Sequence, residues 1–247
     1  MKLIMKRILI FLGAVLGLAA LLTGAIFVRF YLESRKMSVL ESREIASGIF
    51  AVKDSYVNFF LIKNNDSYIA IDTGISEKHV QEALTRLKID PKKVAAVFLT
   101  HSDSDHIGAC SLFPNAVIYL SKAEEQMING QTPRFLFLKN RLGISHESME
   151  DNEIINISGL RIKGILTPGH TPGSMCFLVN DTYLFTGDTM GLKNEEVTGF
   201  NDFFNMDSRR QRESLGRLAD LPGVTSVFSA HYGFTESHET AFRNWKE

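Results

Sequence analysis

The stretch from Val94 to Cys110 places the strongest constraint on how this chain can fold. An apolar run, Val94–Leu99, is typical of a buried strand, and it stops abruptly in a short polar segment. Charged groups held beside a core must be paired or must coordinate a metal. The sequence therefore predicts a cation at the end of this strand. The polar segment offers four side chains of metal-ligand type: His101, Asp103, Asp105 and His106.

The spacing within this segment indicates two ions rather than one. Asp105 and His106 are adjacent, and adjacent residues of a loop point in different directions. We therefore expect His101 and Asp103 to face one ion, and Asp105 and His106 to face the other.

The size and charge of the chain exclude few classes of protein. Its 247 residues fit one large domain or a domain with an appendage. Its formal net charge is −1, so no overall basicity favours a nucleic-acid partner, and none is expected. Cys110 and Cys176 are its two cysteines, and both lie in apolar runs. Two cysteines do not make a disulfide scaffold, and we interpret both as buried thiols.

The N-terminus carries a membrane-spanning pattern. An uncharged run, Ile8–Val28, follows three basic residues and is closed by Arg29. A helix over this run would be about 30 Å long, enough to cross the hydrocarbon core of a bilayer. The run is longer than a usual signal-peptide core and lacks a convincing small-residue cleavage site. We predict a signal anchor at residues 1–29, with a cleaved signal peptide as the second interpretation, and a polar stalk at residues 30–43.

The orientation in the membrane follows less directly from the sequence. Basic residues flank both ends of the apolar run, so the positive-inside rule nearly balances. The signal-like layout favours an N-terminus inside the cell. The prediction is a single-pass protein of the cell membrane with an extracytoplasmic catalytic domain.

The soluble domain is predicted to occupy residues 44–247 and to alternate strands with helices. Apolar alternation and turn signals between the segments define the elements. Strands are expected at Ile45–Val52, Val57–Ile62, Tyr68–Ile71, Val94–Leu99, Val117–Leu120, Glu153–Ile157, Leu160–Leu166, Ser174–Val179, Thr182–Thr186 and Val224–Phe228. Helices are expected at Ser76–Lys88, from Ser121 to about Ile128 with a capping box of Ser121 and Glu124, from Asp207 to about Leu218, and over the final dozen residues. Residues 129–150 are expected to be irregular.

The two halves of this domain resemble each other. Tyr68–Ile71 ends in Asp72-Thr73-Gly74, and Thr182–Thr186 ends in Gly187-Asp188-Thr189. Strands in both halves are also followed by a histidine. The duplication favours two sheets packed together, with helices outside and the polar groups at one rim.

Three further candidate ligands follow apolar strands in the second half. His170 lies in a loop that contains two prolines and two glycines, Asp188 follows Gly187, and His231 follows Ala230. With the four residues of the first segment, they make seven candidate ligands from distant parts of the chain.

These motifs together resemble the metallo-β-lactamase-fold hydrolases, with a motif set like that of glyoxalase II. The matching features are H-x-D-x-D-H at residues 101–106, TPGHTPGS around His170, Gly-Asp at residues 187–188 and the late His231, within residues 44–235. The resemblance implies an α+β, four-layer αββα sandwich and a two-metal site. By analogy, His101, residue 103 and His170 hold the first ion, and Asp105, His106 and His231 hold the second. Asp188 bridges the two ions, and Asp72 lies beside the ligands.

One position departs from the family pattern, which usually has histidine where this chain has Asp103. Two Zn²⁺ bring about +4, and three carboxylates with a hydroxide bring about −4, so the site is near neutral rather than about +1. We therefore hypothesise that harder metals such as Mn or Fe compete better with zinc than in the histidine form. In the alternative, Asp103 does not bind metal and only the second ion is held tightly.

The resemblance implies hydrolysis with a cofactor of two divalent ions, Zn²⁺ being favoured and Fe or Mn being alternatives. A hydroxide activated by both metals would attack an ester, thioester, lactone or related bond, and Asp105 would orient it or receive its proton. The expected substrate is a small or lipid-like molecule. Two alternatives stay open: an iron-dependent oxidoreductase resembling the persulfide dioxygenases, and a non-catalytic, membrane-tethered metal-binding protein.

Two segments are candidates for walls of an apolar substrate groove. Residues 132–145 contain Phe135-Leu136-Phe137-Leu138, and Met190–Met206 contains three phenylalanines. The alternative for both is core packing, because apolar clusters are usually buried.

Overall fold

The computed structural model describes residues 2–135 and 138–246, and it divides into two compact units, Met1–Met37 and Ser38–Glu247. The first unit is a helix, α1 (Lys2–Ser34), so the beginning of the predicted stalk is helical. Its segment Leu3–Ser34 is long and apolar enough to cross a membrane, and a signal sequence near an N-terminus has the same character. The division into anchor, stalk and catalytic domain stays a prediction.

The second unit begins with a seven-stranded sheet. Its order follows the chain from β1 to β7. Strands β1 to β4 pair antiparallel, whereas β4 to β7 pair parallel, with connections that pass over the outer face. The strands are β1 (Arg43–Ala46), β2 (Ile49–Asp54), β3 (Val57–Asn64), β4 (Ser67–Ile71), β5 (Val94–Leu99), β6 (Val117–Ser121) and β7 (Glu147–Met149).

The second sheet has six strands in the order β15-β14-β11-β10-β9-β8. Strands β11 and β14 pair parallel and the other neighbours pair antiparallel. The strands are β8 (Ile154–Ile157), β9 (Leu160–Leu166), β10 (Met175–Val179), β11 (Tyr183–Phe185), β14 (Ser226–Ser229) and β15 (Gly233–Thr235). A separate hairpin is formed by β12 (Met190–Lys193) and β13 (Glu196–Gly199).

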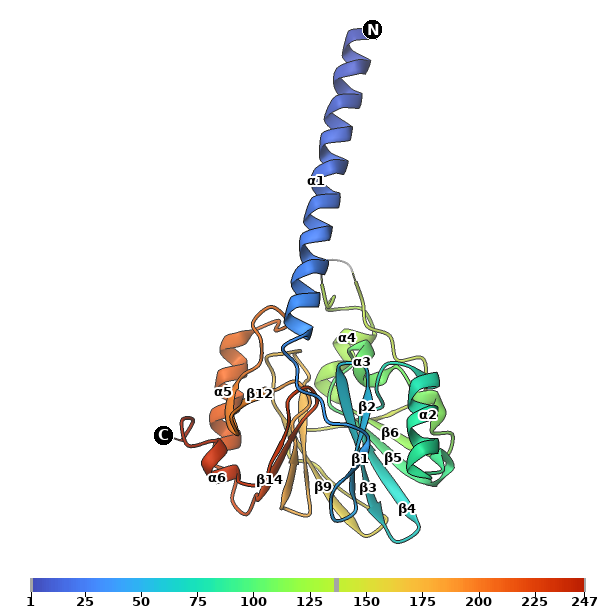
Figure 1. Cartoon of the computed structure of the whole chain (residues 1–247), viewed down its shortest axis with the longest axis vertical. Helices are drawn as coiled ribbons and strands as arrows, with labels where there is room; N and C mark the ends of the chain where they lie inside the picture. The colour runs from blue at the N-terminus through green and yellow to red at the C-terminus, as the bar shows by residue number, and fades with distance from the viewer. Residues whose placement is uncertain (1, 136–137, 247) are drawn as a thin grey trace. The chain divides into compact units, whose positions relative to one another are not determined.

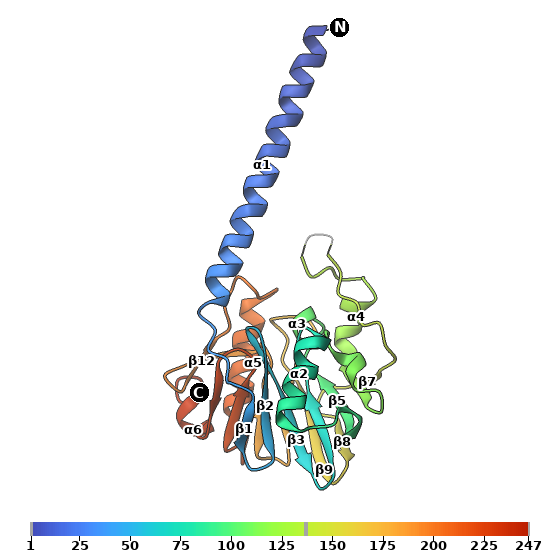
Figure 2. The same cartoon turned by 45° about the vertical axis from the view of Figure 1, so that its right-hand side comes forward.

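The two sheets pack face to face with helices on both outer faces (Figures 1 and 2). Between the sheets, the ring of Phe60 lies 5.3 Å from that of Phe185 and 5.6 Å from that of Phe228. Helix α2 (Glu77–Leu87) buries Val80, Ala83 and Leu84 against the first sheet. Helices α5 (Ser208–Ala219) and α6 (His238–Ala241) cover the second. The predicted four-layer αββα sandwich is confirmed.

Several local predictions were wrong. The predicted strand Ile45–Val52 is two strands, because Gly48 adopts φ +73° in a turn between β1 and β2. The region 129–150 contains β7, whose pairing with β6 is a long-range contact. The C-terminal helix is limited to α6, after which Phe242 is buried and the indole of Trp245 donates to the carbonyl of Val197 at 2.9 Å.

Polar residues gather where parallel-running strands end. Strands β4 and β5 run in one direction in the first sheet, and β9, β11 and β14 share a direction in the second. Short helices α3 (Ser104–Ile107) and α4 (Glu125–Ile128) follow β5 and β6 near this rim. The sandwich thus brings loops from both halves of the domain to one place.

Candidate metal centre

The seven candidate ligands lie together at this rim. His101 and Asp103 follow β5, Asp105 and His106 belong to α3, His170 follows β9, Asp188 follows β11 and His231 follows β14. They form three overlapping clusters in which the ligand atoms lie within 4.8 Å of one another. The clusters are His101, Asp103 and His170; His101, His106 and Asp188; and Asp105, His106 and His231.

The side chains of the first cluster and one oxygen of Asp188 surround one small space, and we call these four residues the first group. His170 Nε2 lies 3.1 Å from Asp103 Oδ2 and 3.4 Å from Asp188 Oδ2. His101 Nε2 lies 3.5 Å from Asp103 Oδ2 and 3.9 Å from Asp188 Oδ2. Four ligand atoms from four side chains therefore face one another.

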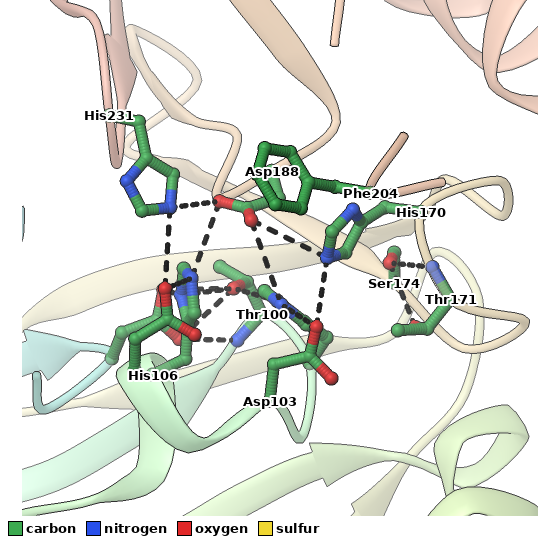
Figure 3. A network of polar contacts seen from close by, with 12 residues as sticks. Thr100, Asp103, His106, His170, Thr171, Ser174, Asp188, Phe204 and His231 are labelled. Atoms are coloured by element: carbon green, nitrogen blue, oxygen red, sulfur yellow. Dashed lines mark hydrogen bonds and ion pairs between the residues drawn. The ribbon is translucent and has the colours of Figure 1, made fainter. Parts of the chain in front are cut away.

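The second group consists of Asp105, His106, His231 and the other oxygen of Asp188, and it has the same form. Asp188 Oδ1 lies 3.1 Å from His231 Nε2 and 3.3 Å from His106 Nε2. Asp105 Oδ2 lies 3.6 Å from His231 Nε2 and 3.8 Å from His106 Nε2. Figure 3 shows the Asp188 carboxylate between the rings of His231 and His170, so that each of its oxygens faces a different group.

These spacings fit divalent ions. With zinc–nitrogen bonds of about 2.0–2.1 Å, the ligand atoms of a tetrahedral site lie about 3.3 Å apart, within the range found here. Three of the facing atoms, His101 Nε2, His106 Nε2 and Asp188 Oδ1, are buried and have no hydrogen-bond partner among the described residues. Such atoms are rare in folded proteins unless an ion or a water satisfies them. A fourth, His170 Nδ1, lies on the other edge of its ring and is not explained by a metal.

Contacts of the Nδ1 atoms fix the orientation of two of the histidine rings. His106 Nδ1 lies 2.8 Å from Asp72 Oδ2, and His231 Nδ1 donates to the carbonyl of Tyr56 at 2.7 Å. A ring that donates from Nδ1 presents its Nε2 lone pair to a metal. Asp72 therefore lies where the family resemblance places it, beside the ligands and behind His106.

Thr100 connects a third ring to the same carboxylate. Its hydroxyl donates to Asp72 Oδ2 at 2.8 Å and lies 3.0 Å from His101 Nδ1, from which it can accept. Gly187, at φ +50°, passes so close that a Cβ there would meet Thr100 Oγ1 at 2.5 Å. This close approach explains why glycine precedes Asp188.

Burial and charge act in opposite directions on these groups. Burial opposes ionisation of Asp188, but the imidazoles of His231, His106 and His170 hold its pKa well below the usual range. Burial opposes protonation of His106, but Asp188, Asp72 and Asp105 raise its pKa well above the usual value. The pKa of His170 is lowered, chiefly by burial, toward the neutral form that binds metals.

Glu124 is a residue of the site that the sequence analysis assigned to a capping box. Ser121 Oγ does accept from Glu124 N at 3.2 Å. The Glu124 carboxylate, however, is fully buried between two ligand loops. It accepts from Ser102 N at 3.0 Å and Ser102 Oγ at 2.6 Å, and from Thr171 Oγ1 at 2.7 Å and Gly173 N at 3.1 Å. Glu124 thus joins the loop of His101 to the loop of His170.

Replacing Glu124 with glutamine is expected to destabilise the domain by about 2 kcal/mol and to lower its melting temperature by about 4–8 °C. The amide keeps one acceptor oxygen but turns an NH₂ group toward two donors. Thermal unfolding monitored by circular dichroism would measure the shift. Glu125→Gln is the matched control, since Glu125 is a third exposed and pairs with His146 at 2.7 Å near the surface. Equal melting temperatures for the two variants would contradict this role of Glu124.

The two segments predicted as walls of a groove differ in how their apolar residues are placed. Phe135 and Leu138 are 51% and 58% exposed, so neither is core, and Leu136 and Phe137 lie outside the described residues. In the second segment, the buried ring of Phe200 lies 5.2 Å from that of His170 and 5.8 Å from that of His231. Phe200 thus packs beside the candidate ligands, and the substrate groove stays a prediction.

The fold and the His/Asp cluster together define a class of protein, the divalent-metal-binding αββα sandwiches. The chain belongs to the metallo-beta-lactamase superfamily, whose sequence model matches residues 52–231. Among solved structures it is similar to a metallo-beta-lactamase family protein from Thermus thermophilus, with a TM-score of 0.63 and 20% identity, covering 82% of this chain and 79% of that one. This likeness supports the fold.

Two curated relatives of the chain are hydrolases by name. A hydroxyacylglutathione hydrolase from Gloeobacter violaceus is 31% identical over 187 residues, which are 73% of this chain and 65% of that protein. The probable polyketide biosynthesis zinc-dependent hydrolase BaeB from Bacillus velezensis is 27% identical over 186 residues, covering 72% of each. The chain thus spans about two thirds of the length of the first relative.

Proposed function

We propose that this protein is a metal-dependent hydrolase of esters, thioesters, lactones or related bonds. The observation that carries the proposal is the convergence of seven ligand side chains into two groups that share Asp188. Two divalent ions held there would supply a water of lowered pKa and a Lewis acid for the substrate oxygen. Zn²⁺ is the metal favoured by the ligand set and by the name of one relative.

The chain's own residues account for the rest of the reaction. The side chain of Asp105 faces His106 and His231 and is 16% exposed, so its carboxylate can also contact a water. Its carboxylate orients the attacking water and receives its proton. Phe200 lies over His170 and His231 and excludes bulk water from that side.

The names of the relatives support acyl-transfer chemistry to water, and a hydroxyacylglutathione is a thioester. A small or lipid-like acyl substrate is therefore part of the proposal. With its N-terminal helix inserted as a single span, the protein would act at the cell membrane, and the signal-like layout of the N-terminus supports a domain outside the cytoplasm.

A substrate panel tests this function. The full chain would be purified in detergent, loaded with Zn²⁺ and given an acyl-glutathione thioester, a nitrophenyl ester, a lactone and a phosphodiester. We expect turnover of at least one of the first three, lost with a chelator and restored by Zn²⁺. Failure on all three, or turnover that a chelator leaves unchanged, would contradict the proposal.

Metal removal is also expected to destabilise the domain. A ligand that binds only the folded state at a hundred times its dissociation constant adds about 2.7 kcal/mol of stability. Differential scanning calorimetry with and without a chelator should therefore show a melting temperature several degrees lower for the metal-free protein. Identical melting curves at full chelation would contradict metal binding by the folded domain.

A further inference from the structure

The carboxylate of Asp103 contacts both a histidine of the first group and the segment between α4 and β7. One oxygen, Oδ2, lies 3.1 Å from His170 Nε2 (Figure 3). Arg134 Nε donates to both oxygens, Oδ2 included, at 2.8 Å, and Asn140 Nδ2 donates to Oδ1 at 2.8 Å. The orientation of Asp103 is therefore set by the segment between α4 and β7.

Arg134 is itself fixed at its other end. Its Nη2 donates to the carbonyl of Phe204 at 2.7 Å and lies 3.1 Å from His170 Nε2. Only 19% of its side chain is exposed. A guanidinium stays charged at every accessible pH, so this contact brings a permanent positive charge to the edge of the site.

The charge of Arg134 offsets the negative charge that Asp103 adds. With aspartate at this position, the summed charge of two divalent ions, three carboxylates and a hydroxide is near zero. One guanidinium returns this charge to about +1, the value expected with histidine. We propose that Arg134 is a positioning residue that makes Asp103 the equivalent of a neutral histidine ligand. This inference rests on the proposed function, since it assumes that the first group binds a metal.

A different arrangement would have Arg134 fill the first site in place of an ion. The contacts of His101 argue against this. Its Nε2 faces the same space, is buried, and has no hydrogen-bond partner among the described residues. A guanidinium that replaced the metal would be expected to satisfy this atom. Arg134 does contact two of the facing atoms, Asp103 Oδ2 at 2.8 Å and His170 Nε2 at 3.1 Å, but it does not hydrogen-bond to His101 Nε2. It therefore borders this space and does not take over all of its ligand atoms.

A double-mutant cycle on the full chain in detergent tests the proposal. Zn²⁺ affinity would be measured by competition with a chromophoric chelator, and stoichiometry by elemental analysis. In the natural background, Arg134→Ala should weaken one of two ions about 10–100-fold, the usual effect of losing a contact behind a ligand. In the Asp103→His background the same substitution should change affinity less than about threefold, because no charge then needs to be offset.

Controls separate this role from others. Arg141→Ala removes an exposed arginine of the same segment and should leave both affinities unchanged. Arg134→Lys keeps the positive charge but not the planar guanidinium, so its Zn²⁺ affinity should lie between those of wild type and Arg134→Ala. Melting temperatures in chelator report on folding alone.

Two outcomes would overturn the proposal. If Arg134→Ala lowered Zn²⁺ affinity equally in the Asp103 and Asp103→His backgrounds, Arg134 would act through the fold and not by offsetting the charge of Asp103. An increase in bound zinc with Arg134→Ala would show that its side chain blocks the first site. Absence of metal binding by the unmodified protein would instead contradict the proposed function itself.

Discussion

Asp188→Asn is expected to lower hydrolysis by about a hundredfold to a thousandfold, on the scale known for losing one preorganised polar group in an active site. The bound metal should fall from two ions per chain to one or none. Asp188 is the residue that both groups share: Oδ1 faces His231 and His106, and Oδ2 faces His170 and His101. Asparagine keeps the shape but removes the negative charge and one acceptor oxygen.

Turnover and metal content of purified Asp188→Asn would be measured side by side. Asp181→Asn is a matched control, because Asp181 lies in the turn just before β11, is exposed and pairs with Arg161 at the surface. An exposed pair of this kind contributes little to stability, and the control should retain activity and metal. Two ions per chain in Asp188→Asn would show that the carboxylate does not bridge them.

The second large effect is expected for Asp105→Asn, which should reduce hydrolysis to background while the domain stays folded. In the proposed function, Asp105 is both a ligand of the second group and the proton acceptor for the attacking water. Loss of a general base alone commonly costs about 10²–10⁴ in rate. The two roles can be separated at saturating Zn²⁺. If Asp105 served only as a ligand, the activity of Asp105→Asn would recover under this condition.

The measurement is turnover of Asp105→Asn at metal concentrations that restore full occupancy. Activity that stays at least about a hundredfold below wild type at full occupancy is the result we expect. Recovery to within about tenfold would limit Asp105 to holding metal.

The sandwich could be predicted because its strongest signals are local. Val94–Leu99 is bounded by polar residues, and β5 has the same bounds. The Asn64-Asn65-Asp66 turn between β3 and β4 follows from residues that tolerate a positive φ, as Asn65 does at +53°. The hairpin of β12 and β13 was missed, because its strands have four residues each and little apolar alternation.

The clustering of the seven candidate ligands was predicted for a similar reason, since each candidate closely follows a strand, while their assignment to two ions came from the family resemblance and stays a prediction. The residues behind the ligands could not be found in this way. Glu124 and Arg134 contact residues 22 to 49 and 31 to 70 positions away, and no local pattern marks such contacts. Glu124 even matched a helix-capping motif, which described its backbone correctly and its carboxylate wrongly.

Arg134 also changes how the departure at Asp103 is interpreted. From the sequence, the extra carboxylate favoured harder metals. With a guanidinium bonded to both Asp103 oxygens, the added charge is offset, and we expect zinc to be retained. Elemental analysis after purification without added metal distinguishes these two expectations. Fe or Mn as the main metal would show that the extra carboxylate still favours harder metals despite Arg134.

Anomalous X-ray diffraction at the zinc edge, from crystals of the zinc-loaded protein, tests the account most directly. We expect two peaks. The first should lie about 2.0–2.2 Å from ligand atoms of His101, Asp103 and His170, and the second at the same distances from Asp105, His106 and His231, with Asp188 reaching both. Peaks elsewhere in the domain, or none at this rim, would contradict the claim that these seven side chains form a dinuclear centre.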